Sequence, residues 1–324
     1  MGYTLCVLGC GTMGIAILSG VLDSLDTSKH SLTNGTNGTK GTNGTNGVHK
    51  WEAHTPGTVS PVGPPDVSTP TRFIACVSRE ATAKKLVSLF ASMGEAASNV
   101  EVLASKNVQA VKQADVVLLC CKPPVAEKIL SEQGMGDVLQ GKLLISILAG
   151  VTISQLTDWV PPSTRVVRAM PNTPCKIREG MTVVTTLPPS PDEESDDVII
   201  LKIFSSIGRC RYLDEKHFDA ATALAGSGPA IACVLLDAMA DGGVMMGLSR
   251  SAALELAAQT FQGAARMVLQ NAHPAQIKDA VCTPGGCTIA GLLALEDGRV
   301  RSTIARGIQA ATERAGELGQ FSKK

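Results

Sequence analysis

The sequence predicts a two-part chain, with a doubly wound, Rossmann-type α/β domain followed by an all-α domain. The apolar segment at 4–9 runs into the glycine-rich loop GCGTMG and then into a helical pattern. Apolar strand-like segments alternate with helical patterns as far as residue 214, and beyond it only helical periodicity is present. We therefore expect a dinucleotide-binding domain over 1–214 and a helical domain over 215–324.

The expected strands are short and mostly apolar. The segment DVVLLCC at 115–121 is a continuous apolar run, which is typical of a strand buried on both faces of a parallel sheet. Helical patterns separate the strands, near 124–132, 152–158 and 192–206 among others. Further strands are expected at 72–78, 142–150, 164–170, 181–186 and 209–214.

One long segment fits neither pattern. Residues 32–47 are a tandem Thr-Asn-Gly tract, and the sequence stays rich in Pro and Gly to about residue 70. Such a segment cannot bury enough apolar surface to offset the entropy of ordering it. We expect 27–70 to be a disordered insertion at the surface of the first domain.

Composition excludes several classes of partner. The 324 residues include 29 basic and 29 acidic side chains and only 3% aromatics, which argues against nucleic acid. None of the ten cysteines forms a CxxC pair and no His/Cys cluster has zinc spacing, so we expect no metal and a reducing compartment. The N-terminus has no basic segment, and no uncharged apolar run reaches the ~18 residues of a membrane span. We expect a cytoplasmic protein without a membrane partner.

The loop at residues 9–14 has the GxGxxG spacing of a dinucleotide site. Gly9 makes the tight turn, Gly11 lets a pyrophosphate approach the backbone, and Gly14 permits close packing of the helix on the strand. Thr12 and Met13 complete the predicted cofactor-binding loop.

The end of the second strand indicates which dinucleotide is bound. Enzymes that use NAD usually carry an acidic residue there, whereas this strand ends in Ser78 and Arg79. A serine hydroxyl and a guanidinium can bind a 2′-phosphate, so we predict NADPH, with NADH as the alternative. A solvated surface charge is the alternative role for Arg79.

Two more segments follow strands at the same predicted sheet edge. Cys121, Lys122 and Pro123 come after the strand at 115–121, and Ala169, Met170 and Asn172 close the strand at 164–170. Ligands bind at the carboxyl ends of strands in doubly wound sheets, so we expect these residues to line the nicotinamide pocket. For Lys122 a plain loop charge is the alternative.

The segment TPGGCT at 283–288 indicates an anion site in the helical domain. Two glycines precede an apolar helical pattern, and a helix N-terminus attracts carboxylate or phosphate through its free N–H groups. For Thr288 alone, the alternative to a ligand contact is a helix N-cap.

These segments together resemble the pyrroline-5-carboxylate reductase family. The motifs that carry the resemblance lie in the family's order along nearly the whole chain: VLGCGTMG, CCKPP, RVVRAMPNTPC, ALAGSGPA, DAMADGGVMMGL and KDAVCTPGGCTIAGLLALE. The resemblance implies a Rossmann domain with a helical dimerisation domain, and dimers that assemble further, often into decamers. It implies the reduction of L-1-pyrroline-5-carboxylate to L-proline, the last step of proline biosynthesis.

The resemblance also implies roles for single residues. The substrate carboxylate is expected at the amides of Gly286, Cys287 and Thr288 and the Thr283 hydroxyl, next to Gly285, with Thr288 near the imine nitrogen. The resemblance also implies a cofactor contact for Asn107, for which a helix cap is the alternative. Two departures are the insertion and Cys287, which stands where the family usually has alanine.

Three alternative functions remain open from the sequence. A hydroxyacid dehydrogenase of the same architecture would generally need a lysine in the helical domain, and the long helical stretch has none after Lys216. Another imine reductase would differ only in its substrate ring. A regulatory NADP(H)-binding protein without activity would show damage to GxGxxG or to PGG-x-T, and both motifs are intact.

Overall fold

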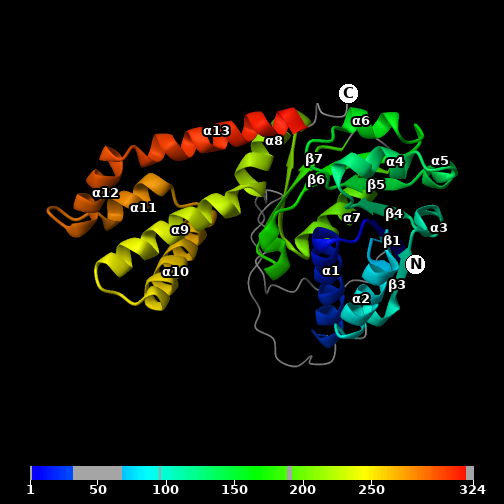
Figure 1. Cartoon of the computed structure of the whole chain (residues 1–324), viewed down its shortest axis with the longest axis horizontal. Coiled ribbons are helices and arrows are strands. Elements are labelled where there is room, and N and C mark those ends of the chain that lie inside the picture. The colour runs from blue at the N-terminus through cyan, green and yellow to red at the C-terminus, as the bar shows by residue number, and fades with distance from the viewer. Residues whose placement is uncertain (1, 32–67, 95, 188–191, 319–324) are drawn as a thin grey trace, which may run out of the picture. The chain divides into compact units, whose positions relative to one another are not determined.

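A computed structural model of the chain describes residues 2–31, 68–94, 96–187 and 192–318 (Figure 1). By its internal contacts the chain divides into two units, Met1–Gly226 with Glu313–Lys324, and Ser227–Thr312. The sequence places the boundary near residue 214, whereas this division by contacts falls after Gly226, beyond a short helical stretch that belongs with the first unit. Each unit is described by itself.

The first unit is built on a sheet in the strand order β3-β2-β1-β4-β5-β6-β7-β8. The order reverses between β1 and β4, as expected of a doubly wound fold, and the predicted fold class is confirmed. The strands are β1 (Tyr3–Leu8), β2 (Pro70–Val77), β3 (Val100–Ala104), β4 (Val116–Leu119), β5 (Leu143–Ser146), β6 (Arg165–Met170), β7 (Gly180–Thr185) and β8 (Gly208–Leu213).

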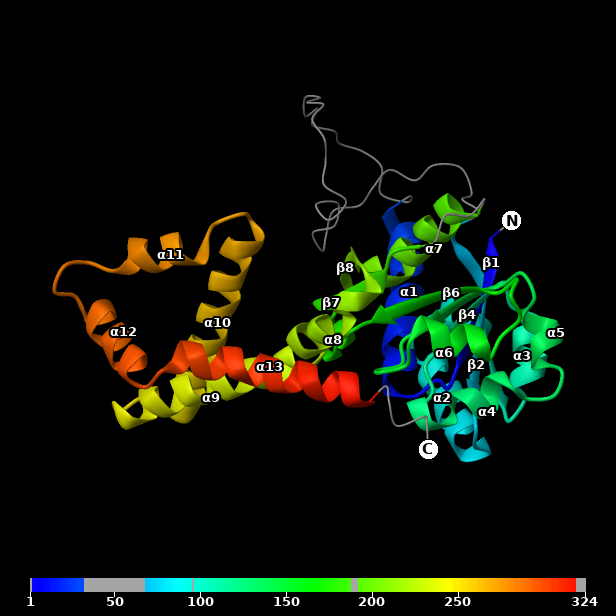
Figure 2. The same ribbon diagram turned by 90° about the horizontal axis from the view of Figure 1, so that it is seen from above.

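Helices cover both faces of this sheet, and Figure 2 shows α1 on one side of β1 and β4 and α3 and α5 on the other. One face packs against α1 (Thr12–Ser31), α2 (Glu80–Ala91) and α7 (Glu193–Ser205). The other packs against α3 (Asn107–Lys112), α4 (Ala126–Leu130), α5 (Met135–Leu139) and α6 (Ile153–Asp158). Because both faces are covered, all four residues of β4 and of β5 are buried, which explains their continuous apolar sequence.

The sheet differs from the sequence expectation at two strands. β6 and β7 pair antiparallel, while the other neighbours are parallel. The connection between them, residues 171–179, contains a single 3-10 turn (Thr173–Ile177) and is too short for the crossover that a parallel pair needs. The edge strand β3 was not expected, because its residues are all only half-buried and Glu101 interrupts its apolar pattern.

The predicted insertion lies largely outside the described residues. Residues 32–67 are not described, so the expectation of disorder there stays a prediction. At its start the expectation was wrong, because α1 continues through residues 27–31 to Ser31. At its end, Pro70 is the first residue of β2 and pairs with Tyr3.

The chain after β8 is helical, as predicted. It begins with a 3-10 turn (Glu215–His217), α8 (Phe218–Ala221) and a π-helical turn (Thr222–Gly226). The π turn and Pro229 interrupt the helical path between α8 and the next helix. The remaining helices are α9 (Gly228–Met245), α10 (Arg250–Leu269), α11 (Pro274–Val281), α12 (Cys287–Asp297) and α13 (Val300–Leu318).

Small residues bring α9 and α10 close together. Ala240, Ala253 and Ala257 are buried, and a Cβ on Gly243 would lie 3.1 Å from the Ala253 Cβ. Much of the remaining apolar surface is uncovered in the single chain, including Val234 (69% exposed), Leu256 (58%) and Met245 (80%). By length and composition alone the stretch Glu215–Met245 is apolar enough to cross a membrane, with a hydropathy of 1.6. An apolar face on a second chain would cover the same surface.

Candidate active site

The backbone geometry of the glycine loop after β1 fits the three roles that its spacing predicts. Gly9 has φ +79°, and a Cβ there would lie 2.7 Å from the backbone of Cys121, so only glycine fits. A Cβ on Gly14 would meet a Val7 methyl at 2.9 Å, which shows how closely α1 packs on β1. Gly11 is different, because a Cβ there would meet only the Gly9 carbonyl, at 3.9 Å. The space in front of Gly11 is therefore open to a ligand.

The start of α1 completes an anion site at this loop. The helix begins at Thr12, so the amides of its first turn have no intrahelical acceptor. A diphosphate that entered the space at Gly11 would meet these N–H groups and the positive end of the helix dipole. The residues present thus fit a dinucleotide.

Ser78 and Arg79 lie where β2 gives way to α2, and both are exposed. Arg79 is the N-cap residue of α2, and its carbonyl accepts hydrogen bonds from the amides of Thr82 and Ala83. No described residue forms an ion pair with its guanidinium. The side chain is therefore available to a phosphate, although its role stays a prediction.

Cysteines surround the glycine loop without forming a reactive group. The amides of Gly9 and Cys10 both donate to the Cys76 carbonyl, at 3.0 and 2.9 Å, which ties the loop to β2. Desolvation by burial raises the pKa of Cys10 to about 12 and that of Cys121 to about 11. These thiols stay neutral near pH 7 and act as small apolar side chains.

Asn107 is not the helix cap that one sequence interpretation offered. The N-cap of α3 is Lys106, and Asn107 is the first residue of the helix. Its Oδ1 accepts from the Cys76 thiol at 3.2 Å, and its Nδ2 donates to Glu132 at 3.1 Å. These bonds hold the amide beside the strand that supports the glycine loop, and the cofactor contact stays a prediction.

The residues at the ends of β4 and β6 differ in their exposure and in their hydrogen bonds. Lys122 is exposed, and Pro123 opens a 3-10 turn behind it. Ala169 and Met170 are buried in β6. Asn172 links three elements, because its Nδ2 donates to the Ala225 carbonyl at 3.0 Å and its Oδ1 accepts from the Met181 amide at 2.8 Å. Its visible role is structural, and a contact to the cofactor remains predicted.

A partly buried ion pair lies behind these segments and carries no signal in the sequence. Arg168 on β6 is 5% exposed and donates from Nη1 to Glu215 at 2.7 Å. The same carboxylate accepts from the Ile153 amide at 2.8 Å, at the start of α6. The guanidinium also stacks on the Phe218 ring, 4.8 Å from its centroid. The chain after β8 is thereby anchored to the sheet.

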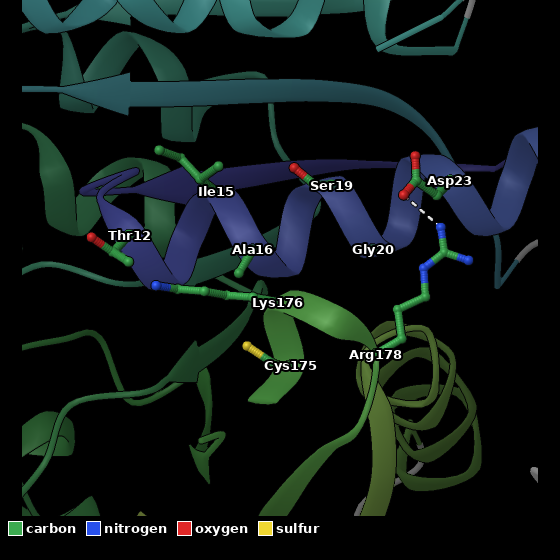
Figure 3. Close-up of a pocket in the computed structure, with 9 residues that line it drawn as sticks. All are labelled: Thr12, Ile15, Ala16, Ser19, Gly20, Asp23, Cys175, Lys176 and Arg178. Carbon is green, nitrogen blue, oxygen red and sulfur yellow. Dashed lines mark hydrogen bonds and ion pairs between the residues drawn. The ribbon is translucent and has the colours of Figure 1, made fainter. Parts of the chain in front are cut away.

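A hollow of about 330 Å³ opens beside α1 (Figure 3). Residues between Thr12 and Asp23 line it from the helix, and Cys175, Lys176 and Arg178 line it from the segment after β6. Arg178 pairs with Asp23 at 2.5 Å. No spacing rule in the sequence connects the segment after β6 with α1, so the sequence carries no signal for Lys176.

The TPGG segment forms a tight turn in the second unit. The Gly286 amide donates to the Thr283 carbonyl at 3.0 Å, and Gly285 has φ +67° behind Pro284, as in a type II turn. A Cβ on Gly286 would lie 2.4 Å from the Thr283 hydroxyl. Because the Gly286 amide is engaged, the amides of Cys287 and Thr288 remain from the three expected carboxylate donors.

Thr288 is not the N-cap of α12. The cap is Gly286, and Thr288 is the second residue of the helix. Its side chain is partly exposed, and Cys287 beside it is exposed. The first-turn amides of α12 and the Thr288 hydroxyl thus remain for a ligand.

Comparison with known proteins supports the family resemblance for both the α/β part and the helical part of the chain. A protein from Schizosaccharomyces pombe described as pyrroline-5-carboxylate reductase is 43% identical over 97% of this chain and 99% of its own length. A Lophium arboricola protein of the same description is 45% identical over 98% of this chain and 93% of its own. The chain belongs to the pyrroline-5-carboxylate reductase family. The family model for pyrroline-5-carboxylate reductase dimerisation matches residues 215–318, and one described as coenzyme F420-dependent NADP oxidoreductase matches 70–150.

A solved structure extends the likeness to the fold. The Plasmodium falciparum pyrroline carboxylate reductase, solved with NADP bound, is 25% identical and has a TM-score of 0.70, covering 98% of each chain. The dimerisation match includes the stretch Glu215–Met245, so a homodimer accounts for its exposed apolar residues. Family membership also decides against a hydroxyacid dehydrogenase.

Proposed function

We propose that the chain holds NADPH at the loops after β1 and β2 and the carboxylate of L-1-pyrroline-5-carboxylate at residues 283–288. Reduction of pyrroline-5-carboxylate to proline is the activity that membership of the family carries, and NADP(H) is the cofactor. The observation that supports this is 43% identity over 97% of the chain, with GxGxxG and PGG-x-T both intact.

The first unit provides the cofactor site in this proposal. The first-turn amides of α1 bind the diphosphate in the open space at Gly11, and Ser78 and Arg79 bind the 2′-phosphate. Lys122, with the ends of β4 and β6, lines the nicotinamide side. When bound, NADPH supplies the hydride that is added to the imine carbon.

The second unit provides the substrate site. The amides of Cys287 and Thr288 and the Thr283 hydroxyl hold the carboxylate at the positive end of the α12 dipole. The Thr288 hydroxyl contacts the ring nitrogen. An alcohol stays neutral near pH 7, so Thr288 orients a nitrogen that already carries its proton, and the product nitrogen becomes a secondary amine.

We extend the proposal to assembly and compartment. The dimerisation match establishes a homodimer, and the family resemblance suggests that dimers associate further into a decamer. All ten cysteines are free, which a reducing compartment maintains, and we place the protein in the cytoplasm on that ground.

The test is steady-state oxidation of NADPH, and then of NADH, with pyrroline-5-carboxylate. Wild type is expected to turn over with both, and faster with NADPH. Thr288→Ala should lower kcat about 100-fold, because the ring nitrogen loses the hydroxyl that orients it, and Thr288→Ser should recover most of the activity. Thr303→Ala, an exposed threonine on α13, is the matched control and should be unchanged.

Two results would contradict separate parts of this proposal. Wild type that is inactive with both cofactors would remove the reductase function from this chain. Active wild type with an equally active Thr288→Ala variant would leave the function in place and remove Thr288 from the site.

A further inference from the structure

The hollow beside α1 holds an unbalanced positive charge. Its charged side chains are Asp23, Lys176 and Arg178. Asp23 and Arg178 neutralise each other at one end of the hollow, through a contact of 2.5 Å. No described residue forms an ion pair or a hydrogen bond with the Lys176 ammonium. One cation thus remains in the hollow without a partner of its own.

The position of the Lys176 side chain places its ammonium near the start of α1. Figure 3 shows Arg178 directed to Asp23, whereas the Lys176 side chain lies along α1 with its ammonium toward Thr12. Thr12 is the first residue of α1 and belongs to the glycine loop. The free ammonium therefore lies toward the end of the helix at which a diphosphate would bind.

We propose that Lys176 is a cofactor-binding residue whose ammonium pairs with the diphosphate of the bound dinucleotide. This inference rests on the proposed cofactor site at the glycine loop. The glycine loop offers the diphosphate only neutral N–H groups. Lys176, which comes from a different element, supplies the positive charge that the loop lacks. The apolar residues Ile15 and Ala16 line the same hollow, where they can pack against the lysine stem.

Direct binding of NADPH, measured without substrate from the nicotinamide fluorescence, tests the assignment. Lys176→Met should raise the Kd about 10-fold or more, which corresponds to the loss of one charge-assisted hydrogen bond. Lys176→Arg should bind within about 3-fold of wild type because the charge is kept. Lys112→Met is the control, because Lys112 is an exposed lysine at the end of α3, just before β4, away from the carboxyl edge of the sheet. Melting temperatures without ligand should be equal for all variants.

Fragments of the cofactor show which phosphate is involved. 2′-Phospho-ADP-ribose contains the diphosphate, and its affinity should fall in Lys176→Met as much as that of NADPH. Adenosine 2′-phosphate contains no part of the diphosphate, and its affinity should change less than about 2-fold.

Three outcomes would overturn the inference, each in its own way. Unchanged NADPH binding in Lys176→Met would make Lys176 a solvated surface charge. Equal weakening of both fragments would place the lysine at the 2′-phosphate instead of the diphosphate. Wild type that does not bind NADPH would overturn the proposed function itself. The Lys176 variants test only the role of Lys176.

Discussion

At the scale of single residues, we expect the side chains at the end of β2 to select the dinucleotide. An acidic residue at this point would bind a ribose hydroxyl and repel a phosphate, whereas Ser78 and Arg79 offer a donor and a positive charge. Arg79 is exposed and has no ion-pair partner among the described residues. Its charge is therefore free to interact with a 2′-phosphate.

Replacing this guanidinium should change cofactor preference. Arg79→Gln is expected to lower kcat/KM for NADPH about 10-fold to 100-fold, because a charge-assisted contact to the 2′-phosphate is lost. The value for NADH should change little, since NADH has no phosphate there. Steady-state kinetics give kcat/KM for NADPH and for NADH, and the ratio of the two values measures the cofactor preference.

Lys84→Gln is the control for Arg79, because Lys84 is an exposed cation on the same helix. If the NADPH to NADH ratio stayed the same in Arg79→Gln, Arg79 would be only a surface charge and another group would have to select the cofactor.

Two residues show which local features the sequence predicts and which it does not. Asn107 and Thr288 were both candidates for helix caps, and in each case the helix begins one or two residues earlier. Local patterns place a helix start only to within a residue or two, because several backbone arrangements satisfy the same free amides. The bonds of Asn107 to Cys76 and Glu132 come from distant parts of the chain, so no local pattern predicts them.

At the scale of elements, the strand–loop–helix unit at 3–31 combines two kinds of glycine. Gly9 and Gly14 are required by the fold, because a Cβ at either would meet protein atoms within 3 Å. Gly11 is not, because a Cβ there has room. Gly9 and Gly14 thus have a folding role, whereas Gly11 leaves a space that a ligand can use.

Alanine at these glycines should separate stability from binding. Gly11→Ala is expected to keep the melting temperature of wild type and to weaken NADPH binding about 10-fold or more, because the methyl group occupies the approach of the diphosphate. Gly9→Ala should lower the free energy of unfolding by about 2–4 kcal/mol, from the left-handed backbone and the contact with Cys121. Thermal unfolding and fluorescence titration measure the two effects. A Gly11→Ala variant that unfolds early but binds normally would reverse the assignment.

The other elements show where an expectation from sequence fails. Buried strands such as β4 are identified correctly, because burial on both faces imposes a continuous apolar run. The edge strand β3 is exposed enough to include Glu101 and lacks that constraint. The antiparallel pairing of β6 and β7 depends on the length of their connection, which strand patterns do not report.

At the scale of the whole molecule, the helical domain exposes more apolar surface than a stable single chain would leave to water. Val234, Met245 and Leu256 are each more than half exposed, and the dimerisation family matches the region that contains them. Large exposed apolar patches mark surfaces that bind a partner. A second copy of the chain is the partner that the dimerisation domain implies.

Charges placed on this surface should separate the subunits. The double variant Val234→Asp/Leu256→Asp is expected to lower the molar mass in solution to that of one chain, because burying unpaired carboxylates in an interface costs several kcal/mol. Light scattering after gel filtration measures the mass, and the wild-type value distinguishes a dimer from a decamer. Val87→Asp on α2, a valine that is 54% exposed in the first unit, is the control. A double variant with the wild-type mass would place the interface on other residues.

The sequence by itself determined the order of domains, the spacing of the glycine loop and the family, and it predicts a phosphate-binding role for Ser78 and Arg79. These features depend on local periodicity and on motifs, which a chain carries whether or not it is folded. Only the tertiary structure decided that Lys176 lies beside the glycine loop, that Arg168 pairs with Glu215, and that β7 runs antiparallel to β6. Each of these joins residues far apart in the chain, and the packing of helices on the sheet, not the local sequence, sets their distance.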